Sequence, residues 1–568
     1  MIAGRLIGWA AAQHGTRPAL IVGARRWTHA EIDARSSRMA QALVALGLAP
    51  GERLAVLLEN SVESLDSLFG AEKAALAYVA LNARHTLAEH LDILADAEAA
   101  AVIVGPQFAT LAAEFAARRG GALPALRFVL GCGAASGAAA AAGAALGAGA
   151  ERAAGGTGAA GAGAAGAAGG TGAAEGAAGT APGIVDLDAV CAAAPARSPQ
   201  IDIGPGHLLR IAYTSGTTGR PKGVAYDLER WQARLANHFL AMEYALSVDD
   251  AMLHVGPLTH AAGVYLFPCF LRGARNVVLD RFEPAGVLAA IAEHRITHLM
   301  VVPTMLARLV DAIEGGARGD WSSLVRIHYG TAPTPVALLR RAQAIFGPIL
   351  RQQYGMTEAV QPLAVLYPHE HVGTSEDGAD DPIGSCGRPS ANVRIVLRDA
   401  AGAEVAPGEV GEITIAHEGI GRVALWRRPE AMAEAVRDGW YYSGDLGRFD
   451  RQGFLHIVGR NKEMIISGGF NVYAREVEDA LASHPAVQEA AVLGLPHAEW
   501  GEVVAAAVVL RAGAAADAEA LAEHCAQRIA GYKKPRRIVF VPALPRNLAG
   551  KVLKGELRDR LAREAGGG

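Results

Sequence analysis

Short runs of apolar residues alternate along the chain with segments in which apolar residues recur at helical spacing. The apolar runs, which we interpret as buried strands, are 54–58, 101–104, 276–279, 299–302 and 394–397. Helical spacing extends over 62–75 and 88–95, and again from Pro284 to His294. Strands that alternate with helices indicate mainly parallel sheets covered on both faces, and hence an α/β fold. On such sheets, ligands bind at the loops that follow the strand ends.

The length of 568 residues exceeds what one hydrophobic core supports, so we expect at least two domains. Basic and acidic residues nearly balance, 53 against 57, for a formal net charge of -4. This balance gives no indication of nucleic acid or an anionic membrane as a partner. The start of the chain does not resemble a signal peptide, and no apolar run is long enough to span a bilayer. The five cysteines are scattered, which favours a reducing cytoplasm over a disulfide framework or a zinc site.

The segment 133–183 differs from the rest of the chain because it consists almost only of alanine and glycine. Leu146 is its one large apolar side chain, so the segment cannot bury enough surface to offset the entropy of ordering. The interspersed glycines each weaken a helix by about 1 kcal/mol relative to alanine. We therefore predict a flexible surface insertion rather than a partner-binding arm.

The segment from Tyr213 to Val224 combines hydroxyls, glycines and one fixed cation in the order Tyr-Thr-Ser-Gly-Thr-Thr-Gly-Arg-Pro-Lys-Gly-Val. Such a loop turns backbone N–H groups toward an anion and adds side-chain donors, which suits phosphate binding. It is not a Walker A loop, because its lysine follows a proline and precedes a glycine. An ordinary surface turn uses the same residue types and is the alternative. The candidate phosphate-binding residues are Thr214, Ser215, Gly216, Thr217, Thr218, Gly219 and Lys222.

A second motif, Tyr354-Gly-Met-Thr-Glu358, follows the related segment Tyr329-Gly-Thr-Ala-Pro333. A carboxylate beside a hydroxyl near nucleotide phosphates suits Mg²⁺, which prefers oxygen ligands, so Glu358 is the candidate metal ligand. Tyr354 offers a ring face to a purine and Thr357 a hydroxyl to a phosphate oxygen. The alternative is an ordinary turn in which this threonine caps a helix. The remaining candidates, where small residues let a nucleotide or substrate approach, are Gly330, Thr331, Ala332 and Gly355.

Two motifs further along the chain carry an acid and a base suited to a ribose. In Trp440-Tyr-Tyr-Ser-Gly-Asp445, the aspartate follows a tight glycine turn and can accept both ribose hydroxyls. In Gly459-Arg-Asn-Lys-Glu463, Arg460 can reach the same sugar or a phosphate. Taken alone, an aspartate after a glycine is more often a turn former.

Lys551 lies near the C-terminus in the segment Pro545-Arg-Asn-Leu-Ala-Gly-Lys551-Val-Leu-Lys554. A lysine on a mobile loop can bring a compact positive charge to a carboxylate that attacks a phosphate. A solvated basic face is the commoner role of a lysine. This one, however, lies in a loop framed by proline and glycine, which favours the catalytic interpretation.

In this order, the motifs resemble those of the adenylate-forming superfamily, which comprises acyl-CoA synthetases, peptide-synthetase adenylation domains and luciferases. The resemblance covers essentially the whole chain apart from the alanine and glycine insertion. It implies a large N-terminal domain of packed mixed sheets with helices, residues 1–459, and a small mobile α+β domain, residues 460–568. The implied roles are a hinge at Lys462, a ribose and phosphate contact at Arg460, a ribose acceptor at Asp445, a phosphate contact at Thr357, a Mg²⁺ ligand at Glu358 and a catalytic lysine at Lys551.

The resemblance also implies a reaction in two halves. A carboxylate attacks the α-phosphate of ATP to give acyl-AMP and pyrophosphate, and after rotation about the hinge a thiol takes the acyl group and releases AMP. The segment Ser467-Gly-Gly-Phe-Asn-Val-Tyr473 resembles the loop that admits coenzyme A in acyl-CoA ligases. Because no carrier-protein domain follows Lys554, we expect a free-standing ligase that uses coenzyme A, and one that loads a separate carrier protein is the alternative. The candidate coenzyme A contacts are Ser467, Gly468, Gly469 and Phe470.

The nature of the acid is indicated by the segment Pro257-Leu-Thr-His-Ala-Ala-Gly263, where the family places a gate and one wall of the acyl pocket. His260 is the candidate gate. The segment has no aspartate to pair with an ammonium group, and a buried ammonium without a carboxylate is costly, so amino-acid activation is disfavoured. We expect a medium- or long-chain fatty acid or a related apolar acid, and an aryl acid stays open. The candidate pocket residues are His260, Ala261, Val264, Met356 and Ala359.

Several departures from the family pattern bear on the acid and on loop motion more than on adenylation. Ser443 stands where the family more often has threonine, Ala474 replaces the usual proline, and 225–229 lacks a histidine commonly found there. A non-catalytic acyl-nucleotide sensor is disfavoured because a sensor has no need of Lys551. The oligomeric state is open, with a homodimer among the alternatives, and the motifs alone do not separate ligation from luciferase-like oxidation.

Overall fold

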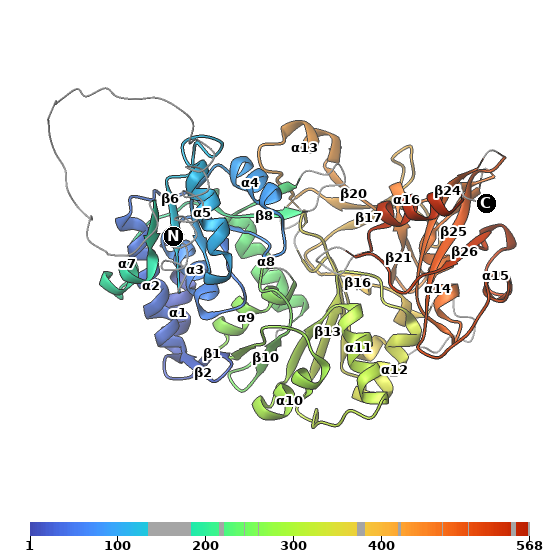
Figure 1. Cartoon of the computed structure of the whole chain (residues 1–568), viewed down its shortest axis with the longest axis horizontal. Helices are drawn as coiled ribbons and strands as arrows, with labels where there is room; N and C mark the ends of the chain where they lie inside the picture. Colours follow the sequence, from blue (N-terminus) through green and yellow to red (C-terminus); the bar gives the residue numbers. More distant parts are fainter. Residues whose placement is uncertain are drawn as a thin grey trace, which may run out of the picture.

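The computed structural model has a mixed α/β fold, with a large N-terminal domain and a smaller C-terminal domain at one end of the molecule (Figure 1). The residues it describes are 1–133, 183–214, 221–242, 245–259, 261–359, 361–371, 381–418, 422–468, 470–497, 499–546 and 552–565. The predicted insertion 133–183 lies outside the described residues except at its two ends.

A nine-stranded sheet runs through the large domain in the order β16-β15-β14-β13-β12-β10-β11-β1-β2. The pairs between β1 and β14 are all parallel, whereas β2, β15 and β16 join antiparallel at the two edges. The strands are β1 (Pro18–Val22), β2 (Arg25–Thr28), β10 (Ala251–His254), β11 (Arg275–Val278), β12 (His298–Val301), β13 (Arg326–Gly330), β14 (Leu350–Tyr354), β15 (Ala364–Leu366) and β16 (Arg388–Pro389).

A seven-stranded sheet lies beside it in the order β7-β6-β5-β3-β4-β8-β9. Its pairs are parallel except for the hairpin between β8 and β9 at one edge. The strands are β3 (Arg53–Leu57), β4 (Ala77–Ala80), β5 (Ala99–Val104), β6 (Phe128–Gly131), β7 (Ile184–Asp186), β8 (Leu208–Thr214) and β9 (Lys222–Asp227).

Helices cover both sheets, and one buried cluster joins the two. Ile7, Leu20, Phe69, Trp231 and Phe270 belong to this cluster and come from four helices and the strand β1. The helices of the large domain are α1 (Arg5–His14), α2 (His29–Ala45), α3 (Val62–Lys73), α4 (Leu87–Asp96), α5 (Ala109–Arg118), α7 (Leu187–Ala193), α8 (Leu228–Ala241), α9 (Leu266–Leu271), α10 (Pro284–His294), α11 (Pro303–Glu314), α12 (Val336–Phe346) and α13 (Pro429–Ala435). The alternation predicted from the sequence is thus present, with the helix 284–294 at the predicted residues.

Two five-stranded sheets complete the fold, and most of their pairs are antiparallel. The run 394–397, which the alternation placed with the parallel sheets, lies in the first of them and pairs antiparallel with its neighbouring strand. This sheet contains β17 (Ile395–Arg398), β18 (Gly411–Ala416), β19 (Val436–Arg437), β20 (Trp440–Phe449) and β21 (Leu455–Arg460). The C-terminal sheet contains β22 (Ile465–Ser467), β23 (Phe470–Val472), β24 (Val487–His497), β25 (Gly501–Leu510) and β26 (Arg537–Phe540), with α14 (Ala474–Ala482), α15 (Ala518–Ala526) and α16 (Lys554–Ala565).

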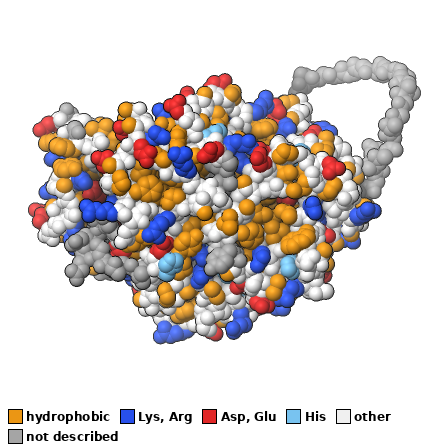
Figure 2. All heavy atoms as spheres, turned by 180° about the vertical axis from the view of Figure 1, so that it is seen from behind, with side chains coloured by type: hydrophobic (Ala, Val, Ile, Leu, Met, Phe, Trp, Pro, Cys, Tyr) orange, Lys and Arg blue, Asp and Glu red, His pale blue; other side chains and the backbone are white. Residues whose placement is uncertain are grey.

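The domain boundary predicted at 459 and 460 falls at the last residue of β21 and stays a prediction. On the face shown in Figure 2, acidic and basic side chains are interspersed, as the nearly balanced composition leads one to expect. No helix within the described ranges is long and apolar enough to cross a membrane.

His90 of α4 makes a testable contribution to stability. Its side chain is fully buried, and neither ring nitrogen has a hydrogen-bond partner among the described residues. Burial, with a smaller effect of His85, lowers the pKa of His90 to about 4. Below about pH 6.5, this histidine therefore binds a proton in the unfolded chain but not in the folded protein. The free energy of unfolding consequently falls as the pH drops from about 6.5 to about 4.

We expect His90→Leu to be more stable than the parent protein, with an advantage that grows by about 2 kcal/mol between about pH 7.5 and about pH 5. Urea unfolding at the two pH values measures the difference. The exposed His369 provides the matched control, since His369→Leu removes a histidine that is not buried. Equal pH dependence of the His90→Leu variant and the parent protein would contradict the buried, neutral state of this histidine.

Candidate active site

The hairpin of β8 and β9 carries the candidate phosphate loop between its strands. Thr214 ends β8 and pairs with Lys222, the first residue of β9, and the threonine hydroxyl donates a 3.4 Å hydrogen bond to the lysine carbonyl. The two ends of the loop therefore lie together at one edge of the seven-stranded sheet. The predicted loop residues that fall outside the described residues are Ser215, Gly216, Thr217, Thr218 and Gly219.

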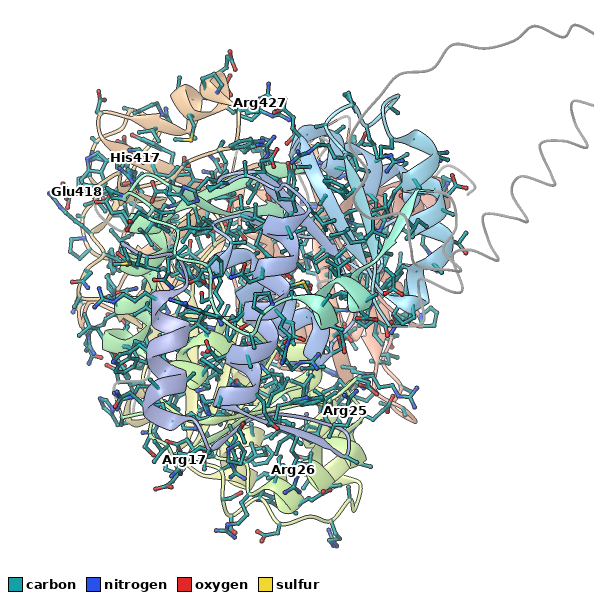
Figure 3. All side chains as sticks on the ribbon, turned by 90° about the vertical axis from the view of Figure 1, so that its left-hand side faces the viewer. Arg17, Arg25, Arg26, His417, Glu418 and Arg427 are labelled. Atoms are coloured by element: carbon teal, nitrogen blue, oxygen red, sulfur yellow. The ribbon has the colours of Figure 1, made fainter. Side chains whose placement is uncertain are left out.

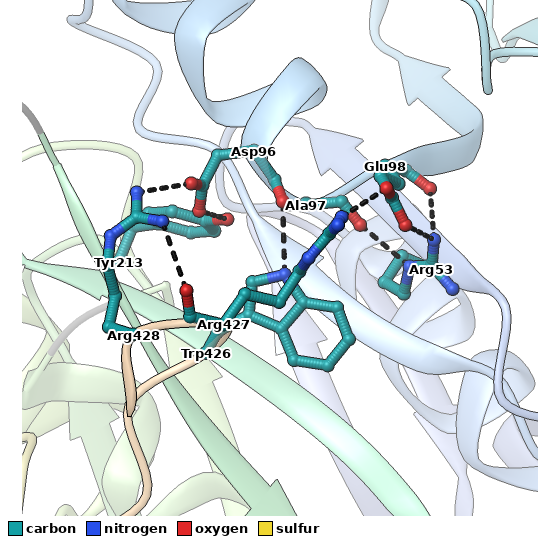
Figure 4. A network of polar contacts seen from close by, with 8 residues as sticks. All are labelled: Arg53, Asp96, Ala97, Glu98, Tyr213, Trp426, Arg427 and Arg428. Carbon is teal, nitrogen blue, oxygen red and sulfur yellow. Dashed lines mark hydrogen bonds and ion pairs between the residues drawn. The ribbon is translucent and has the colours of Figure 1, made fainter. Parts of the chain in front are cut away.

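A polar network around Asp96 holds the strands that lead into this loop (Figure 4). Asp96, at the end of α4, accepts a 2.7 Å hydrogen bond from the Tyr213 hydroxyl of β8 and pairs with Arg428. The Trp426 indole N–H donates to the Asp96 carbonyl at 3.0 Å, from a residue 330 positions away in the sequence. The Trp426 backbone N–H also donates to the Gly223 carbonyl at 2.8 Å. Two distant segments, the end of α4 and residues 426–428, thus fix the position of the hairpin.

Three of the predicted motifs meet at the carboxylate of Asp445. The Tyr354 hydroxyl at the end of β14 donates to this carboxylate at 2.8 Å, and Nε of Arg460 lies 3.1 Å from its other oxygen. Asp445 and Arg460 are direct partners in the ladder between β20 and β21. Burial and the nearby carboxylate raise the pKa of Tyr354 well above its usual value, so its hydroxyl is a donor at all ordinary pH values.

The turn at Thr357 and Glu358 is held through its backbone. Tyr226 of β9 donates its hydroxyl proton to the Thr357 carbonyl, and the Arg230 guanidinium donates to the Glu358 carbonyl. Arg230 is 2% exposed, and it also donates to the carbonyl of Ala225. Sequence reasoning missed both contacts, because a bond to a carbonyl oxygen leaves no requirement on the residue type that supplies it.

The Glu358 side chain is half-buried, and no hydrogen bond or ion pair of its carboxylate is found among the described residues. Burial, followed by the negative charges of Glu358 and Asp445, raises the pKa of the Tyr441 hydroxyl, which places the two carboxylates near the same ring. Carboxylate oxygens without a cationic partner are suited to a hard divalent cation. The described residues contain no group of three or more metal-ligating side chains, so such a cation would need oxygen atoms from a ligand or water as well.

Several cationic side chains lie near these carboxylates. The pKa of Lys462, in the turn after β21, is lowered first by burial and then by Arg460, with a smaller effect of Lys222. Lysines from the phosphate hairpin and from the predicted hinge therefore lie within electrostatic reach of one another. A concentration of cations at a strand end is suited to a polyphosphate.

The segment after β13 brings Gly330, Thr331 and Ala332 to the same end of the sheet as Tyr354. Gly330 pairs with Gln353, and a β-carbon on this glycine would lie 2.4 Å from the Gln353 carbonyl oxygen. The close approach of two strands therefore requires glycine here. Gly355 is restricted in a similar way, because its β-carbon would lie 2.6 Å from the side chain of Gln361.

The candidate acyl-pocket residues do not form one cluster. Met356 and Ala359 pack with Tyr354, and Ala359 is fully buried, whereas Val264 packs in a separate cluster around Tyr265. His260 lies outside the described residues, as does the side chain of Ala261. The predicted pocket therefore stays a prediction.

The C-terminal domain presents the candidate coenzyme A loop. Ser467 is buried, whereas Phe470 is 57% exposed and its ring lies 4.8 Å from the similarly exposed ring of Tyr532. Gly468 packs against Trp500, where a β-carbon would lie 2.7 Å from the indole. Gly469 lies outside the described residues.

Lys551 also lies outside the described residues, between two described residues that pair with each other. Arg546 and Val552 form an antiparallel bridge, and the Leu553 N–H donates to the Pro545 carbonyl at 2.8 Å. The residues on either side of the segment that carries Lys551 are therefore held close together on the C-terminal domain.

The similarity of the chain to known proteins agrees with this arrangement. Residues 7–423 match the family model of the AMP-binding enzyme, and residues 476–551 match that of the AMP-binding enzyme C-terminal domain. The chain belongs to the AMP-binding enzyme family, which is the adenylate-forming superfamily predicted from the sequence.

Its relatives include a medium/long-chain-fatty-acid–CoA ligase of Mycobacterium tuberculosis, 33% identical over 99% of this chain and 90% of that protein. A feruloyl-CoA synthase of an Amycolatopsis species is 34% identical over 95% of this chain and 94% of that protein. Among solved structures, the amide bond synthetase McbA of Marinactinospora thermotolerans has a TM-score of 0.78 and 28% identity, over 98% of this chain and 99% of that one. The predicted enzyme class, an AMP-forming acid–thiol ligase, is confirmed at the level of the family.

Proposed function

We propose that the protein is an ATP-dependent acyl-CoA ligase that activates a medium- or long-chain fatty acid, or a related acid with an apolar body. The observation that carries this proposal is the meeting of Tyr354, Asp445 and Arg460 beside the lysine-bearing phosphate hairpin. That arrangement offers a carboxylate to a ribose and cations to phosphates within one site. An aryl acid is the alternative, and it is supported by the feruloyl-CoA synthase among the relatives.

In this proposal, the phosphate hairpin and Thr357 hold the phosphates of ATP, while Asp445 and Arg460 hold its ribose. Tyr354, together with the backbone at Gly330, Thr331, Ala332 and Gly355, borders the base. Glu358 would hold Mg²⁺, which supplies positive charge to the phosphates when bound. The half-buried carboxylate of Glu358, for which no partner is found among the described residues, supports this assignment.

The chemistry then follows from charge neutralisation and positioning. One carboxylate oxygen of the acid attacks the α-phosphorus of ATP, and the bond to the bridging oxygen breaks, so that acyl-AMP and pyrophosphate form. Lys551 brings a positive charge to the attacking carboxylate in this step. Rotation about Lys462 then removes Lys551 and brings the loop from Ser467 to Phe470 to the site. The thiol sulfur of coenzyme A attacks the acyl carbonyl, and AMP leaves.

The test is AMP formation from ATP and Mg²⁺ with straight-chain, branched, alicyclic and aryl carboxylates, each with and without coenzyme A. For acids of about six or more carbons, we expect AMP release that depends on coenzyme A and a matching acyl-CoA product. Pyrophosphate and bound acyl-AMP without any effect of coenzyme A would instead indicate a carrier protein or another nucleophile as acceptor. A cytoplasmic location and a homodimer stay predictions, which cell fractionation and light scattering would check.

A further inference from the structure

Arg475, in the first turn of α14, connects the small domain with the large one (Figure 1). Its terminal nitrogen Nη2 donates a 3.2 Å hydrogen bond to the carbonyl oxygen of Thr334, which lies 141 positions earlier in the chain, just before α12. No backbone N–H of the described residues donates to this carbonyl, because the cap of α12 is the following residue, Pro335. The arginine therefore supplies a donor to an acceptor that lies outside the helical hydrogen-bond ladder.

The direction of the guanidinium is set by Asp479, one helical turn further along α14. Nε of Arg475 donates to one oxygen of Asp479 at 2.8 Å, and Nη2 lies 2.8 Å from the other oxygen. Because Nη2 carries two N–H groups, one of them meets Asp479 and the second is available to Thr334. The Arg475 side chain is only 18% exposed. A carboxylate that orients the guanidinium and an acceptor in the other domain make this contact directional.

A second, electrostatic link lies on the same side of the large domain. The pKa of Glu314, at the end of α11, is lowered first by its hydrogen bond with Arg341 and further by the charges of Arg341 and Arg511. Arg341 belongs to α12, whereas Arg511 follows β25 in the small domain. The small domain thus interacts with α11 and with the start of α12 through two arginines, one in α14 and one after β25.

Arg475 stands close to the candidate coenzyme A loop in the chain. This loop is the turn of the β22–β23 hairpin, and Arg475 follows the end of β23 by three residues. On the other side of the contact, Thr334 follows the segment 330–332, which lies at the same end of the sheet as Tyr354. The hydrogen bond therefore joins the hairpin to the segment that borders the candidate nucleotide site.

The two glutamates of α14 pair within the small domain, so this helix moves with that domain. Glu476 lies 2.7 Å from Nζ of Lys533, and Glu478 lies 2.8 Å from Nζ of Lys554. When the small domain rotates about the hinge, these pairs travel with α14, whereas the contact of Arg475 with the large domain breaks. The contact is therefore specific to the arrangement in which the candidate coenzyme A loop lies beside the site.

We propose that Arg475 is a positioning residue for the second half-reaction, in which its hydrogen bond to the Thr334 carbonyl holds the coenzyme A loop beside the reaction centre. Arg475 has no chemical part in the attack of the thiol and acts through the hairpin. Loss of the contact lowers the population of this arrangement and leaves the arrangement for acyl-AMP formation at least as populated as before. This inference rests on the proposed ligase function and names a residue that serves one half of it.

The test measures the two half-reactions separately in Arg475→Met, with the acid that the parent protein uses best. In acyl-CoA formation from added acyl-AMP, we expect kcat/KM for coenzyme A to fall by about 10-fold, the effect of losing one hydrogen bond to a charged group. Pyrophosphate release in a single turnover without coenzyme A should rise or fall by no more than about twofold. Arg475→Lys, which keeps the charge but loses the planar fork, should lie between Arg475→Met and the parent protein.

Arg17 provides the matched control, because its Nη2 makes the same two kinds of contact entirely within the large domain (Figure 3). It lies 3.1 Å from a carboxylate oxygen of Asp249 and donates to the Val248 carbonyl at 2.9 Å, 231 positions away. Arg17→Met therefore removes a similar pair of contacts without touching the domain boundary. It should leave the ratio of the two half-reaction rates at the parent value.

Thermal unfolding of each variant detects a loss of folding, which would lower both half-reactions together. Equal losses in both half-reactions of Arg475→Met, or an unchanged kcat/KM for coenzyme A, would overturn the positioning role while the ligase function stands. Failure of the parent protein to form acyl-CoA from any acyl-AMP would overturn the ligase function and this inference together.

Discussion

Replacing Lys551 by alanine is expected to lower the rate of acyl-AMP formation by about 100- to 1,000-fold. In the proposed first half-reaction, an anionic carboxylate must approach an anionic phosphate, and Lys551 supplies the charge that offsets their repulsion. The second half-reaction has no such requirement, since the acyl carbonyl is neutral before the thiol attacks. Transfer of the acyl group from added acyl-AMP to coenzyme A should therefore change by less than about threefold.

Pyrophosphate release and acyl-CoA formation from added acyl-AMP measure the two halves separately. Lys554 is the matched control, because its ammonium group already pairs with Glu478 at 2.8 Å and with Glu463 at 3.4 Å. Lys554→Ala should affect the two halves to a similar, small extent. Equal losses in both halves for Lys551→Ala would mean that this lysine supports the fold or the nucleotide in general, and the role proposed here would be wrong.

Asp445→Ala is expected to raise the KM for ATP by about 30-fold or more and to lower the stability of the large domain. The variant removes the acceptor of the Tyr354 hydroxyl and the partner of Arg460 in one step. Tyr354 is 8% exposed, so its unpaired hydroxyl would cost about 1 to 3 kcal/mol of folding free energy. Steady-state kinetics over a range of ATP concentrations and urea unfolding measure the two effects.

Tyr354→Phe separates the two consequences of that change. It removes the hydroxyl and leaves the carboxylate of Asp445 with Arg460, so we expect a KM for ATP within about fivefold of the parent value. If Asp445→Ala and Tyr354→Phe raise the KM for ATP equally, the aspartate serves to orient the tyrosine and does not itself contact the ribose.

The sequence predicted the fold class because strand and helix periodicity is local. The run at 54–58 and the helix at 284–294 are found within one residue of the expected bounds. The same reasoning misplaced 394–397, since an apolar run does not tell whether its neighbours in the sheet are parallel. The structure supplies that information, because β17 pairs antiparallel with β18, and β18 pairs antiparallel with β20.

The candidate site was accessible from the sequence wherever a side chain must have one chemical character. Tyr354, Asp445 and Arg460 were found in this way, and the structure brings them into contact. Arg230 and Trp426 were not, because they act on backbone carbonyls or through their own backbone. Contacts of this kind depend on where distant segments pass, which motif spacing does not contain.

The surroundings of Arg210 illustrate a further limit. Arg210 stands four residues before Thr214, and the sequence alone gives no reason to connect it with Tyr78 or Trp231. Only the register of three strands and one covering helix brings these residues together. The aromatic rings that surround such an arginine are therefore recognised only after the fold is known.

The ladder between β20 and β21 continues to Arg460, opposite Asp445, and the chain leaves it at Asn461. A rotation of the small domain about a point after Arg460 would leave the proposed nucleotide contacts of Asp445 and Arg460 unchanged. The acyl-AMP made in the first half-reaction is a reactive mixed anhydride. It could then stay bound to the large domain while the part of the small domain that faces it changes. The intermediate would not have to leave and rebind, so water would not reach it in that way. The fraction lost to hydrolysis would then depend on how fast the small domain rotates.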